Sequence, residues 1–219
     1  MDINFTSIIP SIPFILQGIW ITLQIVLLSL LIGFAWGIVL ALCKISRIKP
    51  LMWLADVYTS IFRGTPLVLQ LLLIYYGLPQ LLGFPIEPYP AAVAAFSLNS
   101  AAYISEIIRA GINAIDKGQT EASMALGIPY SKMMKDIIMP QAIKNILPAL
   151  MNEFITLTKE SAIVTVIGVQ DIMRRAYQVG ADTYNYFAPL IFAGLIYYCL
   201  VMVLTLLGKG IEGRMKRSD

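Results

Sequence analysis

The chain has 219 residues, of which 58% are hydrophobic and 13% charged, and its formal net charge is +3. A mean hydropathy of +0.76 is outside the range of ordinary soluble domains and predicts an integral membrane protein. Histidine is absent, and Cys43 and Cys199 show neither CxxC nor metal-ligand spacing, so catalysis and a metal site are not expected. The basic residues flank apolar stretches, which argues for a membrane environment and against nucleic acid as a partner.

Five apolar stretches are long enough to cross a membrane as helices. They cover about residues 14–43, 51–78, 90–112, 140–167 and 186–208. None alternates with a period of two, so spanning strands are not expected. The first stretch has no basic residue before it and no small-residue cleavage site, and is therefore kept as a span. The predicted fold is an all-α membrane protein with five transmembrane helices in a single domain, residues 1–219.

Basic residues concentrate after the first stretch, around the break that follows the third, and at the C-terminus, while the loop after the second stretch has none. By the positive-inside rule, the N-terminus is predicted outside and the C-terminus in the cytoplasm. Arg174 and Arg175 would then lie outside, against the rule. The residues that support the orientation are Lys44, Arg47, Lys49, Arg109, Lys117, Lys132, Lys135, Lys144, Lys209, Arg214, Lys216 and Arg217.

Prolines and glycines inside the stretches predict local features of the helices. Pro66 and Pro148 each remove a backbone hydrogen bond and free the carbonyl four residues earlier, so kinks or unwound turns are expected there. Gly33 and Gly37 form a GxxxG pattern in the first stretch. This pattern is typical of close helix packing in membranes.

Polar side chains share faces on the second, third and fourth stretches. At about 1.5 Å per residue, Thr65, Asn99 and Glu153 reach similar depths near the membrane centre, where transporters tend to hold substrate. We therefore expect substrate contacts from Arg63, Thr65, Ser97, Asn99, Asn152, Glu153, Thr156 and Glu160.

Structural roles are alternatives for several ionisable residues of these stretches. Asp56 with Arg63, and Glu106 with Arg109, have the helical spacing of ion pairs. Lys159, next to Glu160 near the outer end of the fourth stretch, suits snorkelling or a gate as well as ligand contact.

Residues 116–138 interrupt the apolar sequence on the predicted cytoplasmic side. Residues 119–126 favour a short helix, Gly127 fits a left-handed closing position, and Pro129 prevents continuation. A second short helix is expected from Ser131 to Pro140. An interfacial helix is one interpretation, but the first piece lacks large apolar anchors opposite a basic face. The small residues Ala122 and Ala125 favour a docking helix that another protein approaches closely.

Several motifs in order carry a family resemblance. Glu121-Ala122-Ser123, Gly127 and Ile138-Met139-Pro140 resemble the EAA signature of bacterial ABC importer permeases, with Ser123 in place of the second alanine. Further matching motifs are Arg63-Gly64-Thr65-Pro66, residues 105–111 (SEIIRAG), Gly118-Gln119, Pro140-Gln141-Ala142, Pro148 and residues 152–155 (NEFI). Together, over about residues 15–210, they resemble permeases of the polar amino acid uptake family.

That resemblance implies a type I importer (MetI-like) fold in a bacterial inner membrane, with lipid around it and the permease paired with a second copy or a paralogue. It implies two copies of a cytoplasmic ATPase that bind ATP and Mg, and an extracytoplasmic amino acid binding protein, free or tethered. This chain has no phosphate-binding loop of its own. The implied contacts to the ATPase are Gln119, Thr120, Glu121, Ala122, Ala125, Leu126, Gly127 and Ile128.

A carboxylate at Glu153 favours a cationic substrate such as arginine, lysine or histidine. A neutral polar amino acid stays possible if Glu153 is protonated or is paired with Arg63 or Lys159. Two other classes compete with the importer: a secondary transporter or channel, which an odd number of spans without an inverted repeat disfavours, and a scaffold, which would not need polar faces on three spans.

Overall fold

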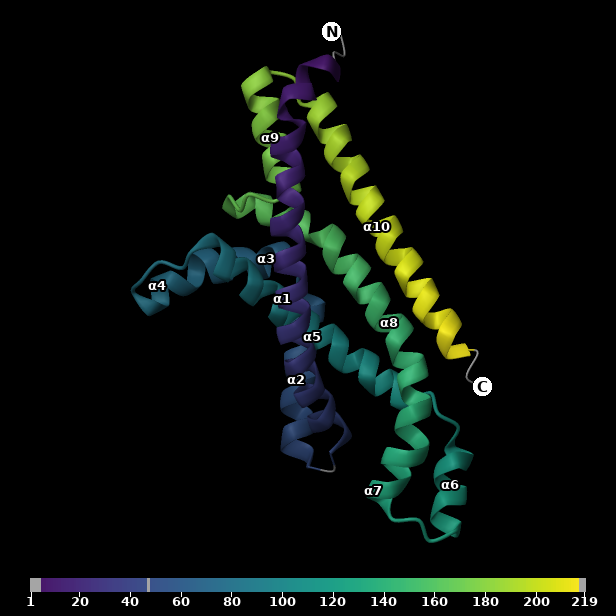
Figure 1. Cartoon of the computed structure of the whole chain (residues 1–219). Coiled ribbons are helices and arrows are strands. Elements are labelled where there is room, and N and C mark those ends of the chain that lie inside the picture. The colour runs from purple at the N-terminus through teal and green to yellow at the C-terminus, as the bar shows by residue number, and fades with distance from the viewer. Residues whose placement is uncertain (1–4, 47, 217–219) are drawn as a thin grey trace.

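A computed structural model describes residues 5–46 and 48–216, and the regular structure of this part is entirely helical. Arg47 and Arg217, which were counted for the orientation, are outside the described residues. Figure 1 shows α1 running along most of the molecule, with α8 and α10 beside it and α6 and α7 at one end. The elements are η1 (Phe5–Ser11), α1 (Ile12–Ile45), α2 (Lys49–Gly64), α3 (Leu67–Leu72), η2 (Leu73–Gly77), α4 (Leu78–Leu82), α5 (Pro88–Asn113), α6 (Lys117–Ala125), α7 (Tyr130–Met133), η3 (Met134–Ile138), α8 (Met139–Glu160), η4 (Ser161–Ile167), α9 (Ile172–Thr183) and α10 (Phe187–Lys216).

Three helical stretches are long and apolar enough to cross a membrane: Ile8–Ile45, Pro88–Asn113 and Phe187–Gly213. A fourth candidate is the bent pair Lys49–Gly64 and Leu67–Leu82. The expected fourth span, residues 140–167, corresponds to α8 followed by the 3-10 turn η4. It is not among the candidates, since Lys144, Glu153, Lys159 and Glu160 dilute its apolar character. Length and composition therefore support three or four of the five predicted spans.

The GxxxG pattern lies where α1 crosses α5. A Cβ atom on Gly33 would stand 3.0 Å from Ser100 Cβ, and one on Gly37 would stand 2.8 Å from Ile104 Cγ2. Larger residues would push the two helices apart, and dispersion contacts between closely spaced helices are what stabilises them in lipid. The packing role expected for this pattern is confirmed.

The second apolar stretch is not one kinked helix but two helices at a steep angle. α2 ends at Gly64, Thr65 and Pro66 are extended, and α3 begins at Leu67. The two parts, Lys49–Gly64 and Leu67–Leu82, meet at 103°, so α3 and α4 project sideways from the main bundle (Figure 1). Pro66 predicted the position of the break but not its size.

Two polar anchors hold α9 at the end of the molecule near the N-terminus. The buried Asp171 carboxylate caps α9 by accepting from the Arg174 N–H at 2.8 Å, and it also accepts from Thr165 Oγ1 and Tyr197 Oη. Burial raises the pKa of the Asp171 carboxyl, against the lowering effect of these hydrogen bonds.

Arg175 joins α9 to the start of α1. Its Nη1 donates to the carbonyl of Phe14 and to Gln17 Oε1, both at 3.1 Å, and its guanidinium lies over the Phe14 ring. One of the two arginines that count against the positive-inside rule therefore has a structural role.

Candidate functional site

Two buried side-chain amides donate hydrogen bonds to the backbone carbonyls at the break between α2 and α3. Pro66 has no N–H for the Phe62 carbonyl, and this carbonyl instead accepts from Gln70 Nε2 at 2.8 Å and Asn99 Nδ2 at 3.2 Å. Gln70 Nε2 also donates to the Thr65 carbonyl and hydroxyl, while Asn99 Nδ2 donates to Gln70 Oε1 at 2.9 Å. The freed carbonyl is thus satisfied inside the protein, as backbone at membrane depth requires.

This hydrogen-bonded cluster brings together two of the predicted substrate residues, Thr65 and Asn99. Gln70 joins them. It was not predicted as a site residue, although it is the only polar residue in the run LVLQLLL and lies four residues after Pro66. Asn99 is only 4% exposed, and its Nδ2 donates to the Phe62 carbonyl and to Gln70 Oε1 at the break, so in this conformation it supports the backbone.

Glu153 lies on α8 facing α5. Ser100 Oγ donates to Glu153 Oε1 at 3.4 Å, a long hydrogen bond. No ion pair to Glu153 occurs within residues 5–46 and 48–216, and the negative charge of Glu160, two turns along α8, acts on it unfavourably. Asn152 and Thr156 are exposed on the same helix. The arrangement is a weakly bonded carboxylate with polar neighbours, which a cation would stabilise.

The surroundings of Ser97, Lys159 and Glu160 differ from those of Glu153. Ser97 Oγ is buried without a hydrogen-bond partner and faces an apolar hollow of about 530 Å³ that is also lined by Leu28 and Ile32 of α1. Lys159 is exposed and Glu160 half-buried at the end of α8. The structure therefore does not bring Ser97 to the Glu153 carboxylate, and the substrate roles of these residues stay predictions.

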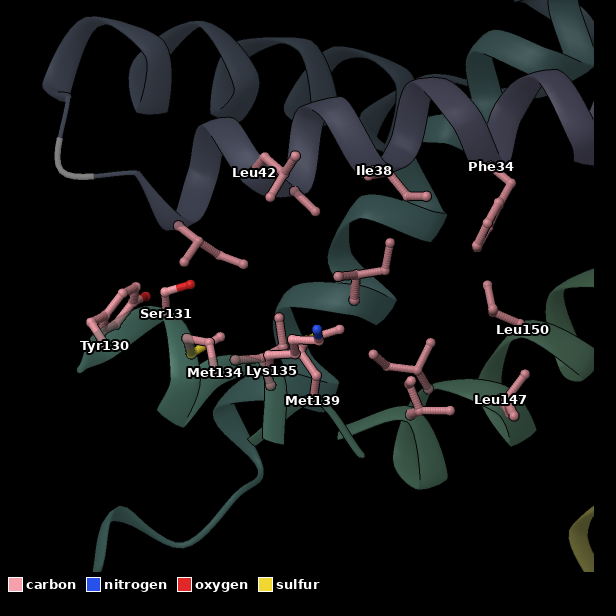
Figure 2. A pocket seen from close by; sticks show the side chains of 16 residues that line it. Phe34, Ile38, Leu42, Tyr130, Ser131, Met134, Lys135, Met139, Leu147 and Leu150 are labelled. Atoms are coloured by element: carbon pink, nitrogen blue, oxygen red, sulfur yellow. The ribbon is translucent and has the colours of Figure 1, made fainter. Parts of the chain in front are cut away.

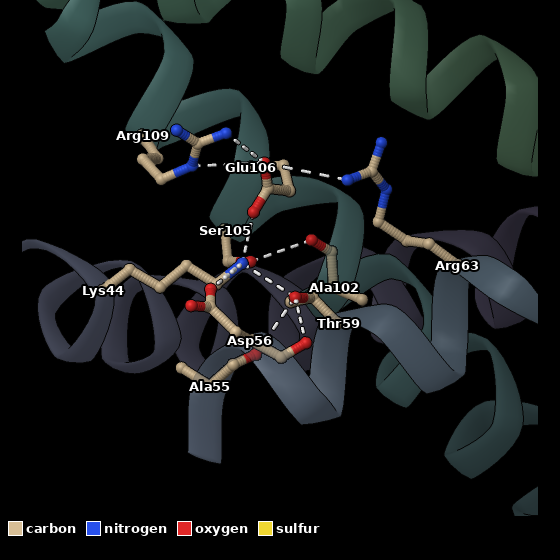
Figure 3. A network of polar contacts seen from close by, with 9 residues as sticks. All are labelled: Lys44, Ala55, Asp56, Thr59, Arg63, Ala102, Ser105, Glu106 and Arg109. Atoms are coloured by element: carbon tan, nitrogen blue, oxygen red, sulfur yellow. Dashed lines mark hydrogen bonds and ion pairs between the residues drawn. The ribbon is translucent and has the colours of Figure 1, made fainter. Parts of the chain in front are cut away.

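A second polar cluster, the inner ionic network, consists of Lys44, Asp56, Arg63, Glu106 and Arg109 (Figure 3). Lys44 Nζ contacts Glu106 Oε1, lies 3.6 Å from Asp56 Oδ1 and donates to Thr59 Oγ1 at 2.8 Å. Glu106 Oε2 lies 2.7 Å from Arg109 Nη2 and 3.7 Å from Arg63 Nη1. The network thereby joins α1, α2 and α5.

The pairing partly differs from the expected one. The Glu106–Arg109 pair is present, but Asp56 pairs with Lys44 and Arg63 with Glu106, in place of an Asp56–Arg63 pair. Arg63 also lies over the Tyr103 ring, with 5.4 Å from Cζ to the ring centroid. Lys44 had been assigned only to the loop charge, yet its side chain is 2% exposed. Sequence spacing on one helix does not reveal a partner on another.

The 116–138 segment forms a short exposed helix and a sharp turn. The Asp116 carboxylate caps α6 by accepting from the Gly118 N–H at 2.6 Å. Gly127 has φ +70°, the left-handed conformation predicted for it. Its N–H bonds to the Met124 carbonyl, and the N–H of Ile128 bonds to the Ser123 carbonyl, both at 3.0 Å, which closes the helix.

The surface of α6 and its turn is open. Met124 is 62% and Leu126 78% exposed, and Ala122 and Ala125 are exposed as well. Ser123 instead points inward and donates to the Gln119 carbonyl, so the departure from the EAA pattern is not on the open surface.

The second helix starts at Tyr130 and continues through η3 into α8, so the expected end at Pro140 is wrong. Pro140 lies in the first turn of α8, where its missing N–H is tolerated.

Comparison with known proteins agrees with these features. Residues 33–217 match the family described as the inner membrane component of binding-protein-dependent transport systems. The arginine transport system permease protein ArtQ of Bacillus subtilis (strain 168) is 67% identical, with both chains covered completely. A putative glutamine transport system permease protein, GlnP of Rickettsia bellii (strain RML369-C), is 52% identical over 94% of each chain.

Among solved structures, a crystal structure of an amino acid ABC transporter with histidines matches with a TM-score of 0.94 and 46% identity, covering 98% of this chain and 100% of that one. The fold is therefore that of type I ABC importer permeases. The chain belongs to the family of inner membrane components of binding-protein-dependent transport systems. Such permeases are not enzymes, and ATP hydrolysis belongs to a separate subunit.

Proposed function

We propose that this chain is the permease of an ATP-driven importer of basic amino acids in a bacterial inner membrane. The observation that carries the substrate class is the Glu153 carboxylate, which lies among exposed polar residues and, within residues 5–46 and 48–216, is held by one long hydrogen bond from Ser100. A guanidinium or ammonium group would offset its desolvation and donate charge-assisted hydrogen bonds. The full-length likeness to an arginine transport permease supports the same choice.

The proposed assembly holds two permease chains, two ATPase subunits that bind ATP and Mg, and an extracytoplasmic binding protein. In each permease, five spans place the N-terminus outside and the C-terminus in the cytoplasm. In Figure 1, α10 runs from the end near the N-terminus toward the half of the molecule that holds α6 and α7. This arrangement supports the orientation, because basic residues cluster in these parts of the chain.

The substrate class is tested by Glu153→Gln in proteoliposomes that contain permease, ATPase and a binding protein that delivers each amino acid. Uptake of arginine should fall by roughly tenfold or more, since a hydrogen bond to a charged group contributes about 1.5–3 kcal/mol. Uptake of glutamine should stay within about twofold. Glu87→Gln, at an exposed acidic residue before α5, is the matched control. Equal losses of both substrates, or undiminished arginine uptake, would remove Glu153 as the selector of charge.

We also propose that Gln119, Thr120, Glu121, Ala122, Ala125, Leu126, Gly127 and Ile128 form the contact to the ATPase. The exposed small and apolar residues of α6 support this role. Nothing lies within 4 Å of a Cβ built on Gly127, so within this chain a substitution there acts through the backbone conformation.

Gly127→Val should abolish the stimulation of ATP hydrolysis by substrate, because a β-branched residue resists the left-handed region. Gly127→Asn should retain much of the stimulation, because asparagine tolerates this region. If the valine variant hydrolyses ATP and transports like the wild type, the docking role is wrong. Nothing found here favours a transporter that works without an ATPase.

A further inference from the structure

An apolar groove runs between α1 and the continuous helix formed by α7, η3 and α8, and it is separate from the Glu153 region. Its volume is about 860 Å³, in the range of pockets that take sizeable ligands. Phe34, Ile38 and Leu42 line one wall, Met139, Leu147 and Leu150 line the other (Figure 2), and α5 contributes Ile108 and Ile112. Among the residues that line the groove, Lys135 is the charged one.

The π turn η3 keeps one face of the second wall on the groove. The lining residues Ser131, Lys135, Met139, Ile143 and Leu147 recur at every fourth position. In a regular α-helix of 3.6 residues per turn, such a row drifts around the axis by about 40° per step. The wider turn at Met134–Ile138 holds more residues per turn and reduces this drift. The π turn therefore lets residues of α7, η3 and α8 line the groove along one face of the helix.

The polar side chains of the groove come from the first residues of its second wall. Tyr130, Ser131 and Lys135 lie on α7 and η3, and in Figure 2 Tyr130 and Ser131 are at the same end as Leu42, close to where α1 ends at Ile45. Lys135 is exposed and forms no ion pair with any residue in the described ranges. In the orientation proposed above, this end faces the cytoplasm.

We propose that the groove binds an anionic phospholipid of the cytoplasmic leaflet, with an acyl chain along the apolar walls and the phosphate at Lys135 and the hydroxyls of Ser131 and Tyr130. The match is one of polarity and charge: an apolar ligand body for the walls, and one negative group for the Lys135 cation. A polar solute would find no hydrogen-bonding partners along the walls, and burying it there would cost free energy.

The headgroup contact is tested with the assembled transporter in nanodiscs of equal parts phosphatidylglycerol and phosphatidylcholine, extracted into mild detergent. Native mass spectrometry should find phosphatidylglycerol retained in preference to phosphatidylcholine. Lys135→Gln should reduce this preference about fivefold, the factor that corresponds to about 1 kcal/mol for one basic residue at an anionic surface. Lys132→Gln, at an exposed lysine of α7 that does not line the groove, should keep the preference within about twofold. Absence of any preference, or equal effects of the two variants, would overturn the proposal.

A groove-filling variant tests the acyl chain. Ile143 is 43% exposed and lines the groove, so Ile143→Trp should reduce the retained phosphatidylglycerol several-fold. Leu206→Trp, on an α10 position that is 63% exposed and outside the groove, should not. Cysteine crosslinking from position 143 provides the competing readout. Efficient crosslinks to a second permease copy, with lipid retention unchanged in Ile143→Trp, would mean that protein and not lipid fills the groove.

Discussion

Two carboxylates at the α5 interfaces of this protein have opposite surroundings. Glu106, in the inner ionic network, contacts Lys44 and Arg109 and has Arg63 at 3.7 Å. Glu153, on α8, has a single hydroxyl partner, Ser100, at 3.4 Å. Both residues are acidic, and both face α5 or lie on it, yet among the described residues Glu106 is surrounded by cations and Glu153 has none.

The difference distinguishes a charge that stabilises the fold from a charge that is available to a ligand. Charges that neutralise one another hold together the helices that carry them. Removal of one of these charges leaves an uncompensated buried charge. A carboxylate without a cation remains costly at membrane depth until it meets one, and is for this reason a functional candidate. The contrast predicts that substitutions in the network change stability and that substitution of Glu153 changes ligand response.

Lys44→Met should have the largest effect on stability. The Lys44 side chain is 2% exposed and bridges Asp56, Thr59 and Glu106, so its loss leaves carboxylates of two helices without their shared cation. Removal of one partner from a buried pair typically costs about 3–5 kcal/mol, and we expect about 3 because Arg109 and Arg63 still neutralise Glu106. Thermal unfolding of the detergent-solubilised transporter measures the loss.

The control for this prediction is Arg109→Gln in the same network. The Arg109 side chain is 42% exposed, and pairs in contact with solvent contribute about 0–1 kcal/mol. If the two variants lose the same stability, the network is not organised around Lys44 and the contrast with Glu153 weakens.

Gln70→Leu tests the hydrogen bonds at the helix break, where no charged group takes part. Leucine fills a similar volume but leaves the Phe62 and Thr65 carbonyls and the Asn99 amide without the bonds that Gln70 supplies. An unsatisfied buried group costs about 1–3 kcal/mol, and we expect a loss in this range by the same thermal measurement.

Gln141→Leu is the matched control for the amide. Gln141 Nε2 donates to the Ile137 carbonyl on its own, unbroken helix, so its loss should cost about 1 kcal/mol or less. A larger loss for Gln141→Leu than for Gln70→Leu would contradict the role assigned to the amides at the break.

Much of the local structure could be predicted from the sequence because it depends on single residues. Gly127 marked the left-handed turn, Pro66 marked the helix break, and Gly33 with Gly37 marked a close helix crossing. The turn and the helix break follow from backbone sterics within a few residues. The glycine pattern predicts that another helix packs closely there but does not reveal which one.

Features that depend on how helices rotate against one another could not be predicted. Lys44 lies far from Glu106 in sequence, and only the packing of α1 on α5 brings them together. The 103° angle after Gly64 likewise depends on where α3 packs, with Gln70 of α3 bonded to Asn99 of α5. For α8, the same polar residues that suggested a substrate face also keep it out of the candidate spans.

Glu153→Gln should have the smallest effect on stability of the variants considered. Glutamine retains an oxygen that accepts from Ser100 and removes a carboxylate that has no cation within the described residues. The variant should therefore lose no stability, because a carboxylate without a cation is costly to bury. The response to ligand should change more. Arginine at a hundred times its dissociation constant would stabilise the wild type by about 2.7 kcal/mol, and this shift should largely vanish in the variant while glutamine has the same small effect on both. The measurement is thermal unfolding of the assembled transporter with and without each amino acid. An arginine-dependent shift that survives in Glu153→Gln, or a loss of stability as large as that of Lys44→Met, would place Glu153 among the structural charges.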